Sequence, residues 1–442
     1  MENSKVIFGN ELLDAYKNDM DNAVVNYWDR TYPKQVHFSL NYSMLSRHLL
    51  LLGGAGSGKT NVFKLTMTQL REKASTNDVF IIFDTKGDFY EGFGKDMDLI
   101  LGNSKEYREK SQRWNIYDEV LADGENPEDY EVNAREIAAS LFEDRGSSSQ
   151  PFFSNAARDI FAHALIYFIR EAVNNPADGL RKLNNKSLTD FLLNANGSDY
   201  EKMFNKYSDM KGVMSYLGDG TSNQALGVLG ELKSMLYDLF IGVFNDNDMH
   251  GRFSMRDSVR KKQGRAIFIE YDLMTGETLT PIYRLLVDLA LKEALGRSDS
   301  EGGNVYMILD ELKLLPKLKH MDDALNFGRG KGVKVIAGLQ SINQLYDIYG
   351  EAKGKVIAGG FSTLFAFHTS DNESREYVSK LFGTNVVGYH YTGIDGVIEK
   401  REREGYAVET WDQSSLNIGE AVIGLADNEN PFLFQFTEYK DR

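Results

Sequence analysis

A glycine-rich segment that ends in lysine and threonine has the clearest chemistry in this sequence. It reads Gly53-Gly54-Ala55-Gly56-Ser57-Gly58-Lys59-Thr60, which is the P-loop pattern G-x-x-x-x-G-K-T. Glycines let successive backbone N–H groups converge on phosphate oxygens, and the helix that follows presents its positive end to them. We expect Lys59 to reach the β- and γ-phosphates and Thr60 to place its hydroxyl on Mg²⁺. The segment therefore predicts a nucleotide site.

The residues on either side favour a P-loop over a flexible glycine turn. The apolar run Leu49–Leu52 predicts a buried strand that leads into the loop. Residues 61–65 predict the start of a helix directly after it. A P-loop requires this order of strand, loop and helix, whereas a simple turn does not.

A pair of acids supplies the carboxylates that such a site needs. The apolar run Val305–Leu309 predicts a strand, and Asp310 and Glu311 follow it. We expect Asp310 to order the metal shell and Glu311, one residue further on, to polarise the attacking water. Many strands end in solvated acids, so the pair is informative mainly together with the P-loop.

Three further polar residues follow or precede predicted strands, and each has two interpretations. Gln340 ends the strand predicted from residue 333 and could sense the γ-phosphate or align water, or merely end the strand. Arg329 lies in a glycine-rich loop and could be an arginine finger acting on a neighbouring subunit, or part of a surface turn. Asp84 could contact the metal shell or cap the next element, and capping is the favoured interpretation.

Length and composition restrict the class of protein. At 442 residues the chain is too long for one ordinary core, so we expect two or more domains. It contains no cysteine, which excludes disulfides, thiolate zinc sites and cysteine nucleophiles. No run reaches the ~18 unbroken apolar residues of a membrane span. The charged N-terminus does not resemble a signal peptide, so we expect a cytoplasmic chain.

The charge of the chain is acidic, with a net value of −15. A uniformly acidic surface repels phosphate, so contact with DNA would have to be local or arise in an assembled channel. Two basic clusters are present: Arg256, Arg260, Lys261, Lys262 and Arg265, and separately Lys313, Lys317, Lys319, Arg329, Lys331 and Lys334. For either cluster alone, a solvated face is the preferred interpretation over a DNA contact.

The order of the predicted elements indicates an α/β fold. Short apolar runs predict parallel strands at residues 49–52, 79–83, 266–271, 305–309, 333–337 and 363–367. Helical patterns lie between some of them, notably at residues 281–295 and 321–327, which favours a doubly wound sheet. Residues 119–252 read as helical, with linker-like stretches at 146–149 and 218–223. The simplest account is an all-α insertion in an α/β core.

These motifs together resemble the type IV secretion coupling proteins of bacterial conjugation, TraD/TraG-like members of the wider FtsK/HerA group of DNA-pumping ATPases. The resemblance is carried by residues 48–60, 84–88, 114–115, 308–311 and 338–350. The last of these stretches, with Gly-Leu-Gln-Ser at its start, is the most specific for the family, and the P-loop is the least specific. The helical insertion resembles the family's all-α domain.

The resemblance implies a RecA-like hexameric motor that binds ATP and Mg²⁺ between subunits and threads single-stranded DNA through a central channel. It implies nucleotide-site roles for Lys59, Thr60, Asp310, Glu311 and Gln340, and a finger acting in trans for Arg329. The predicted domains are an N-terminal segment at 1–46, a nucleotide-binding domain at 47–118 and 253–442, and an all-α domain at 119–252.

The predicted function is an ATP-driven translocase that delivers conjugative DNA, with an attached relaxase, to a type IV secretion channel. Many family members begin with a membrane-spanning segment and this sequence shows none, so we expect docking on a membrane partner unless a segment was removed. One alternative is a nucleotide-gated platform that recruits protein cargo, favoured by the acidic surface and the missing anchor. Another is a motor of the same superfamily that acts in defence or chromosome processing.

Overall fold

The computed structural model describes residues 5–18, 20, 22–32, 36–145, 151–175, 179, 183–218, 220–246, 251–298, 301–392 and 398–440. The chain forms two compact units. The first contains Met1–Met97, Gln263–Ala266 and Ala294–Arg442, and the second contains Asp98–Lys262 and Ile267–Glu293. The linker predicted at 146–149 lies outside the described residues. The predicted division into three domains stays a prediction.

The first unit is built on a mainly parallel sheet. Its strand order is β16-β15-β12-β4-β11-β10-β5. The parallel strands are β4 (Leu49–Leu52), β5 (Val79–Asp84), β10 (Val305–Leu309), β11 (Val333–Leu339) and β12 (Thr363–Phe367). Every residue of these strands is buried, which explains why each reads as an unbroken apolar run rather than an alternating one. The predicted α/β class is confirmed.

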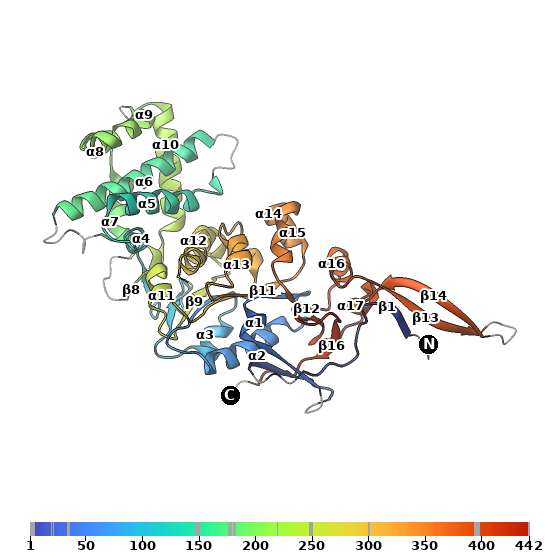
Figure 1. Ribbon diagram of the computed structural model, residues 1–442. Coiled ribbons are helices and arrows are strands. Elements are labelled where there is room, and N and C mark those ends of the chain that lie inside the picture. The colour runs from blue at the N-terminus through green and yellow to red at the C-terminus, as the bar shows by residue number, and fades with distance from the viewer. Residues whose placement is uncertain are drawn as a thin grey trace. The chain divides into compact units, whose positions relative to one another are not determined.

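Helices cover both faces of this sheet because the chain moves across it in two directions. The connection from β4 through α2 (Lys59–Glu72) to β5 crosses the sheet away from β16, and α3 (Asp88–Phe93) follows β5. Two later connections cross the sheet in the opposite direction, towards β16. One runs from β10 through α13 (Met321–Phe327) to β11, and the other runs from β11 through α14 (Asn343–Tyr349) and α15 (Glu351–Gly359) to β12. Right-handed crossovers therefore place α2 and the α13–α15 group on opposite faces, as Figure 1 shows.

Antiparallel strands that the sequence did not predict complete the first unit. β15 (Glu420–Gly424) pairs with β12, and β16 (Phe432–Gln435) pairs with β15. A hairpin of β13 (Thr384–Thr392) and β14 (Ile398–Tyr406) takes β1 (Lys5–Gly9) as its third strand. The remaining elements are β2 (Ala23–Trp28), β3 (His37–Asn41), α1 (Tyr42–Leu45), η5 (Leu312–Leu314), α16 (Asn372–Phe382) and α17 (Thr410–Ser414).

The second unit is mostly helical (Figure 1). Its helices are α4 (Ile116–Val120), α5 (Pro127–Leu141), α6 (Pro151–Asn174), α7 (Asn185–Asn194), α8 (Gly197–Asn205), η3 (Ser208–Val213), α9 (Met214–Leu217), α10 (Asn223–Leu239), η4 (Gly242–Phe244), α11 (Met255–Lys261) and most of α12 (Gly276–Leu295). Short parallel pairs join β6 (Leu99–Leu101) to β9 (Ala266–Glu270) and β7 (Arg113–Trp114) to β8 (Arg252–Phe253).

The long helix α6 forms the centre of this helical group. It packs against α5 and α10, and its buried positions include Ile160, Phe161, Leu165 and Ile169. Ala162 and Ile166 are buried as well, so α6 is buried on more than one side, as a helix packed between neighbours must be. Within the described ranges, the structure shows no helix that is both long enough and apolar enough to cross a membrane.

Candidate nucleotide site

The P-loop lies at the carboxyl end of β4, between β12 and β11. The N–H of Gly53 donates to the carbonyl of Leu339 at 3.0 Å, and the N–H of Gly54 donates to that of His368 at 2.9 Å. A Cβ on Gly53 would lie 2.6 Å from Cβ of Phe367, so only glycine fits there. Gly58 precedes the first residue of α2 with a φ of 112°, a left-handed conformation that favours glycine. The loop is therefore tied to both neighbouring strands.

Lys59 and Thr60 are the first two residues of α2. The Lys59 ammonium lies over the loop, where it donates to the carbonyl oxygen of Gly53 and, at 3.1 Å, to that of Gly54. Burial lowers the pKa of Lys59, and the nearby carboxylates of Glu311 and Asp310 oppose that shift. The helix terminus and this ammonium together make a site of positive potential for an anion.

Asp310 follows β10 and lies next to the end of β5. Its Oδ2 accepts a hydrogen bond from Oγ1 of Thr85 at 3.3 Å. Burial, with further contributions from Asp84 and Glu311, raises the pKa of Asp310 to about 6. A divalent cation would reverse this shift, because it stabilises the charged carboxylate.

A cation at this position would need oxygen atoms beyond those of the protein. No group of three or more His, Cys, Asp or Glu side chains in the described ranges is arranged to hold a metal ion. One carboxylate from Asp310 and one hydroxyl from Thr60 are the donors that Mg²⁺ accepts when phosphates and water complete its shell. The two residues therefore fit a nucleotide-bound Mg²⁺.

Glu311 and Gln340 meet at the ends of adjacent strands. Nε2 of Gln340, which follows β11, donates to Oε2 of Glu311 at 2.6 Å. Burial raises the pKa of Glu311, whereas the bond from Gln340 lowers it. Oε1 of Glu311 is buried and has no hydrogen-bond partner among the described residues. The carboxylate is thus held by one oxygen while the other is left to accept a proton or orient a water.

Asp84 caps the element that follows it, which confirms the favoured prediction. Its Oδ1 accepts from the N–H groups of Lys86 and Gly87, both at 3.1 Å. Its Oδ2 accepts from Phe89 at 2.7 Å and from Tyr90 at 3.4 Å, which satisfies the first turn of α3. Thr85 had no predicted role in the site, because only the pairing of β5 with β10 brings its hydroxyl to Asp310.

Arg329 lies at the opposite edge of the sheet from the P-loop. It is exposed in the turn between α13 and β11, whereas Gln340 follows the other end of β11. The seven residues of β11 span about 23 Å. Arg329 therefore cannot reach the P-loop of the same chain, and among the described residues it has no ion pair. Neighbouring basic residues line a cavity of about 320 Å³ around it, namely Arg297, Lys331 and Lys334.

The loop that carries Arg329 is fixed by Arg297. Nη1 of Arg297 donates to the carbonyl of Lys331 at 2.9 Å, and Nζ of Lys331 donates back to the carbonyl of Arg297 at 2.7 Å. Lys334 is only 2% exposed and donates to Oδ1 of Asn304, and burial lowers its pKa to about 8. The preference for a solvated face is thus wrong for Lys334, although Arg329 itself is exposed.

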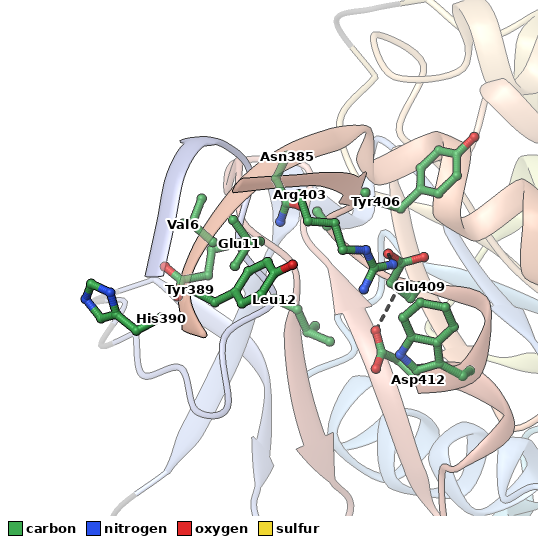
Figure 2. Close-up of a pocket in the computed structure, with 14 residues that line it drawn as sticks. Val6, Glu11, Leu12, Asn385, Tyr389, His390, Arg403, Tyr406, Glu409 and Asp412 are labelled. Atoms are coloured by element: carbon green, nitrogen blue, oxygen red, sulfur yellow. Dashed lines mark hydrogen bonds and ion pairs between the residues drawn. The ribbon is translucent and has the colours of Figure 1, made fainter. Parts of the chain in front are cut away.

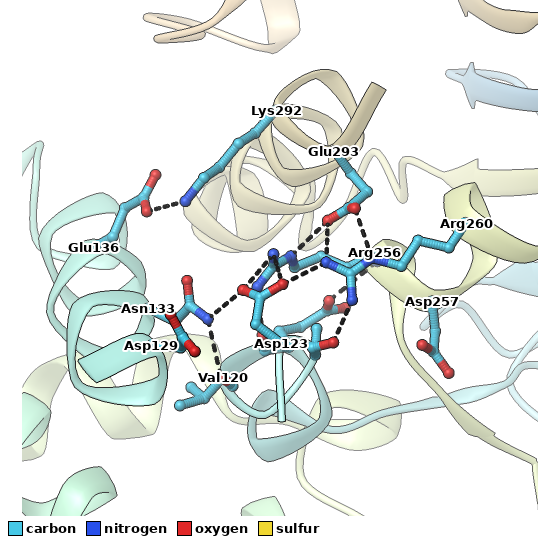
Figure 3. Close-up of polar contacts among 12 residues, drawn as sticks. Val120, Asp123, Asp129, Asn133, Glu136, Arg256, Asp257, Arg260, Lys292 and Glu293 are labelled. Carbon is cyan, nitrogen blue, oxygen red and sulfur yellow. Dashed lines mark hydrogen bonds and ion pairs between the residues drawn. The ribbon is translucent and has the colours of Figure 1, made fainter. Parts of the chain in front are cut away.

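The first basic cluster is a solvated face only in part, because Arg260 and Lys261 are exposed whereas Arg256 and Lys262 are buried. Arg256 is 5% exposed in the second unit, where its Nη2 contacts Asp123 at 2.7 Å and its Nε contacts Glu293 at 2.9 Å. Arg260 contacts the same two carboxylates, as Figure 3 shows. Burial alone would raise the pKa of Asp123, but hydrogen bonds from Asn133 and the two arginines hold it well below its usual range. These arginines are occupied by acids, which the linear sequence did not reveal.

A larger cavity lies away from the P-loop, beside the β13–β14 hairpin. It encloses about 670 Å³ and is bordered by β1, the hairpin and α17 (Figure 2). The guanidinium of Arg403 lies 5.2 Å from the ring centre of Trp411, and its Nη2 donates to Glu409 at 2.9 Å. No motif in the sequence predicted this cavity.

The fold and the site define an α/β protein with a P-loop, two strand-end acids and a strand-end glutamine in one sheet. Residues 35–396 match the family model described as the type IV secretion-system coupling protein DNA-binding domain. The chain belongs to this family of coupling proteins.

Known relatives agree with this assignment. The chain is similar to the coupling protein TraD of Escherichia coli strain K12, with 23% identity over 348 residues that cover 76% of this chain and 44% of that protein. This chain therefore spans less than half the length of that relative.

Solved structures show the same fold. The chain is similar to the bacterial conjugative coupling protein TrwBdeltaN70 in an unbound form, with a TM-score of 0.75, 21% identity and coverage of 99% of this chain and 94% of that one. It is similar to the plasmid coupling protein TrwB in complex with ADP and Mg²⁺, with a TM-score of 0.72, 20% identity and coverage of 99% and 95%.

Proposed function

We propose that this protein is an ATP-hydrolysing motor that moves conjugative single-stranded DNA, with its relaxase, towards a type IV secretion channel. The observation that carries the proposal is the arrangement of Lys59, Asp310, Glu311 and Gln340 at the carboxyl edge of one sheet. A protein of the same fold is known in complex with ADP and Mg²⁺, which supports nucleotide binding here. Membership of the coupling-protein family supports the role in conjugation.

In the proposed reaction, the glycine-rich loop and the terminus of α2 bind the phosphates through backbone N–H groups. Lys59 leaves the loop carbonyls and neutralises charge on the β- and γ-phosphates. Glu311, oriented by Gln340, aligns the attacking water through its free Oε1. When bound, Mg²⁺ would neutralise phosphate charge next to Thr60 and Asp310.

The position of Arg329 supports an assembly in which subunits contact head to tail. One sheet edge of each subunit carries the P-loop, and the other edge carries an exposed arginine without an ion pair among the described residues. A ring of subunits joins such unlike edges around a closed circle. Arg329 would then stabilise developing charge on the nucleotide of the neighbouring subunit, and we propose a hexamer.

The acidic charge of the chain favours a second candidate function. The net charge of −15 disfavours contact with DNA, and Arg256 and Arg260 of the first basic cluster are already paired to acids. In this alternative the helical unit recruits a protein cargo, and nucleotide binding only controls assembly. Membrane association through a partner protein is a proposal in both cases.

ATPase rates with and without single-stranded DNA distinguish the two candidates. A motor is expected to hydrolyse ATP faster when DNA is present, and Lys59→Thr should abolish the stimulated rate because it removes the phosphate ligand. Lys353→Thr, which changes a lysine of α15 away from the P-loop, is the control. A rate that does not respond to DNA, at concentrations where subunits assemble, would support the recruitment platform instead.

A further inference from the structure

The order of the strands determines on which side of the P-loop a nucleotide base must lie. Glu311 and Gln340 follow β10 and β11, which lie on one side of β4. The γ-phosphate must face these residues if they act on it. The β-phosphate occupies the loop itself, so the ribose and base extend towards the other side of β4, where β12 and β15 lie.

A short loop on that other side contacts the P-loop directly. This loop, residues 415–419, joins α17 to β15. The N–H of Gly419 donates to the carbonyl of Ser57 at 2.9 Å. A Cβ on Gly58 would lie 2.9 Å from Cα of Gly419, so the two backbones are in close contact. The loop is thus part of the wall of the phosphate site.

The same loop presents an exposed apolar side chain. Ile418 is 77% exposed, although it directly precedes the residue that contacts the P-loop. Its carbonyl accepts from Nε2 of Gln435 at 3.0 Å, and Phe436 N–H donates to Gly419 at 2.8 Å. Asn417 is tied to Glu420 by two hydrogen bonds of 2.9 Å. The loop is anchored on both sides of Ile418, so this side chain is held at the surface by a fixed backbone.

The C-terminal segment closes the same corner. Nδ2 of Asn61, the third residue of α2, donates to the carbonyl of Thr437 at 2.9 Å. Its Oδ1 accepts from the N–H of Tyr439 at 2.7 Å. The start of α2 is therefore flanked by the loop that carries Ile418 and by this segment, and both lie where the base must leave the phosphate site.

We propose that Ile418 forms the apolar contact for the nucleotide base. The inference rests on the proposed function, because it requires a nucleotide on the P-loop. An aliphatic side chain packs against the flat face of either purine, and Nδ2 of Asn417 is already bonded to Oε2 of Glu420. An apolar contact of this kind does not by itself distinguish adenine from guanine, so the contact with Ile418 should contribute about equally to the binding of ADP and of GDP.

The test compares a ligand that has a base with one that lacks it. Calorimetry on the full chain would measure binding of Mg²⁺-ADP and of Mg²⁺-pyrophosphate. Ile418→Ala should lower the affinity for Mg²⁺-ADP by about three- to tenfold because an apolar contact is lost, and Ile418→Asp should lower this affinity further. Ile418→Leu should bind ADP like the natural protein, and pyrophosphate binding should not change in any of these variants.

Val356→Asp provides the matched control, since Val356 is a 52% exposed branched residue of α15. Thermal melting of every variant would confirm that it folds. Unchanged ADP affinity in Ile418→Asp would overturn the proposal. An equal loss of affinity for ADP and for pyrophosphate would also overturn the proposal, because the substitution would then act on the P-loop itself. If the natural protein binds neither ligand, the proposed function fails and this inference with it.

Discussion

Gln340 Nε2 donates a hydrogen bond of 2.6 Å to Glu311 Oε2, and this bond joins the carboxyl ends of two adjacent strands. The two residues lie 29 positions apart in the sequence. The bond fixes one carboxylate oxygen and leaves the other unpaired among the described residues. A change in the position of Gln340, such as one caused by a γ-phosphate, would therefore move Glu311.

Removing this bond should reduce hydrolysis without reducing binding. We expect Gln340→Leu to lower the ATP turnover rate by about 10- to 100-fold, because Glu311 loses its orienting partner. The affinity for Mg²⁺-ADP should stay the same, since the described hydrogen bonds of the Gln340 side chain go to Glu311 and none goes to the P-loop. Turnover assays and calorimetry would measure the two quantities. A Gln340→Leu variant with the natural turnover rate would show that the amide only ends its strand.

The opposite-edge position of Arg329 predicts complementation between defective subunits. Arg329→Ala and Glu311→Gln should each abolish turnover alone. In an equal mixture, about a quarter of the sites would combine an intact Glu311 with an intact arginine from the neighbour, so activity should return. Mixing Lys59→Thr with Glu311→Gln is the control, because both changes damage the same half of the site. If neither mixture hydrolyses ATP, Arg329 does not act on the nucleotide of a neighbouring subunit.

His48 predicts a loss of stability in mild acid. This residue precedes β4, is 1% exposed, and its Nδ1 accepts from the N–H of Val335 at 3.0 Å. Burial lowers its pKa from 6.5 to about 4. Between pH 6.5 and pH 4, His48 is therefore protonated in the unfolded chain but stays neutral in the folded chain. The free energy of unfolding consequently falls as the pH drops from 6.5 towards 4. The loss attributable to His48 should be about 3 kcal/mol.

A matched variant isolates that contribution. His48 has a φ of 63°, a left-handed conformation that asparagine tolerates. His48→Asn keeps a hydrogen-bond acceptor but cannot take up a proton in this range. Urea unfolding at pH 7 and pH 4 should show a smaller loss of free energy for His48→Asn than for the natural protein. Parallel losses in the two proteins would assign the acid sensitivity to other groups.

The buried arginine of the second unit predicts a large effect on stability. Arg256→Met should destabilise that unit by about 3–5 kcal/mol, because Asp123 and Glu293 would lose a partner that is nearly inaccessible to solvent. Lys261→Met removes an exposed ion pair with Asp257 from the same helix and should change stability by less than about 1 kcal/mol. Chemical unfolding of both variants would measure the difference. Similar small effects would mean that Arg256 and Arg260 replace one another.

Local sequence patterns were sufficient to predict the parallel core. β4, β10 and β12 begin and end as predicted from their apolar runs, because strands buried on both faces have little choice of residue type. The antiparallel strands β13 and β14 were not predicted. Their sequences are rich in polar and charged residues, so they contain no apolar run. In addition, β13 pairs with β1, which lies more than 370 residues earlier in the chain.

The sequence by itself determined the P-loop, the strand-end acids and the family, since these depend on residue types at short spacing. Only the tertiary structure decided which residues meet. It brought Gln340 to Glu311 and Thr85 to Asp310, placed Arg329 at the far edge of the sheet, and paired Arg256 with acids instead of solvent. The reason is physical: strand order and side-chain burial arise from contacts between distant segments, and a linear pattern does not contain them.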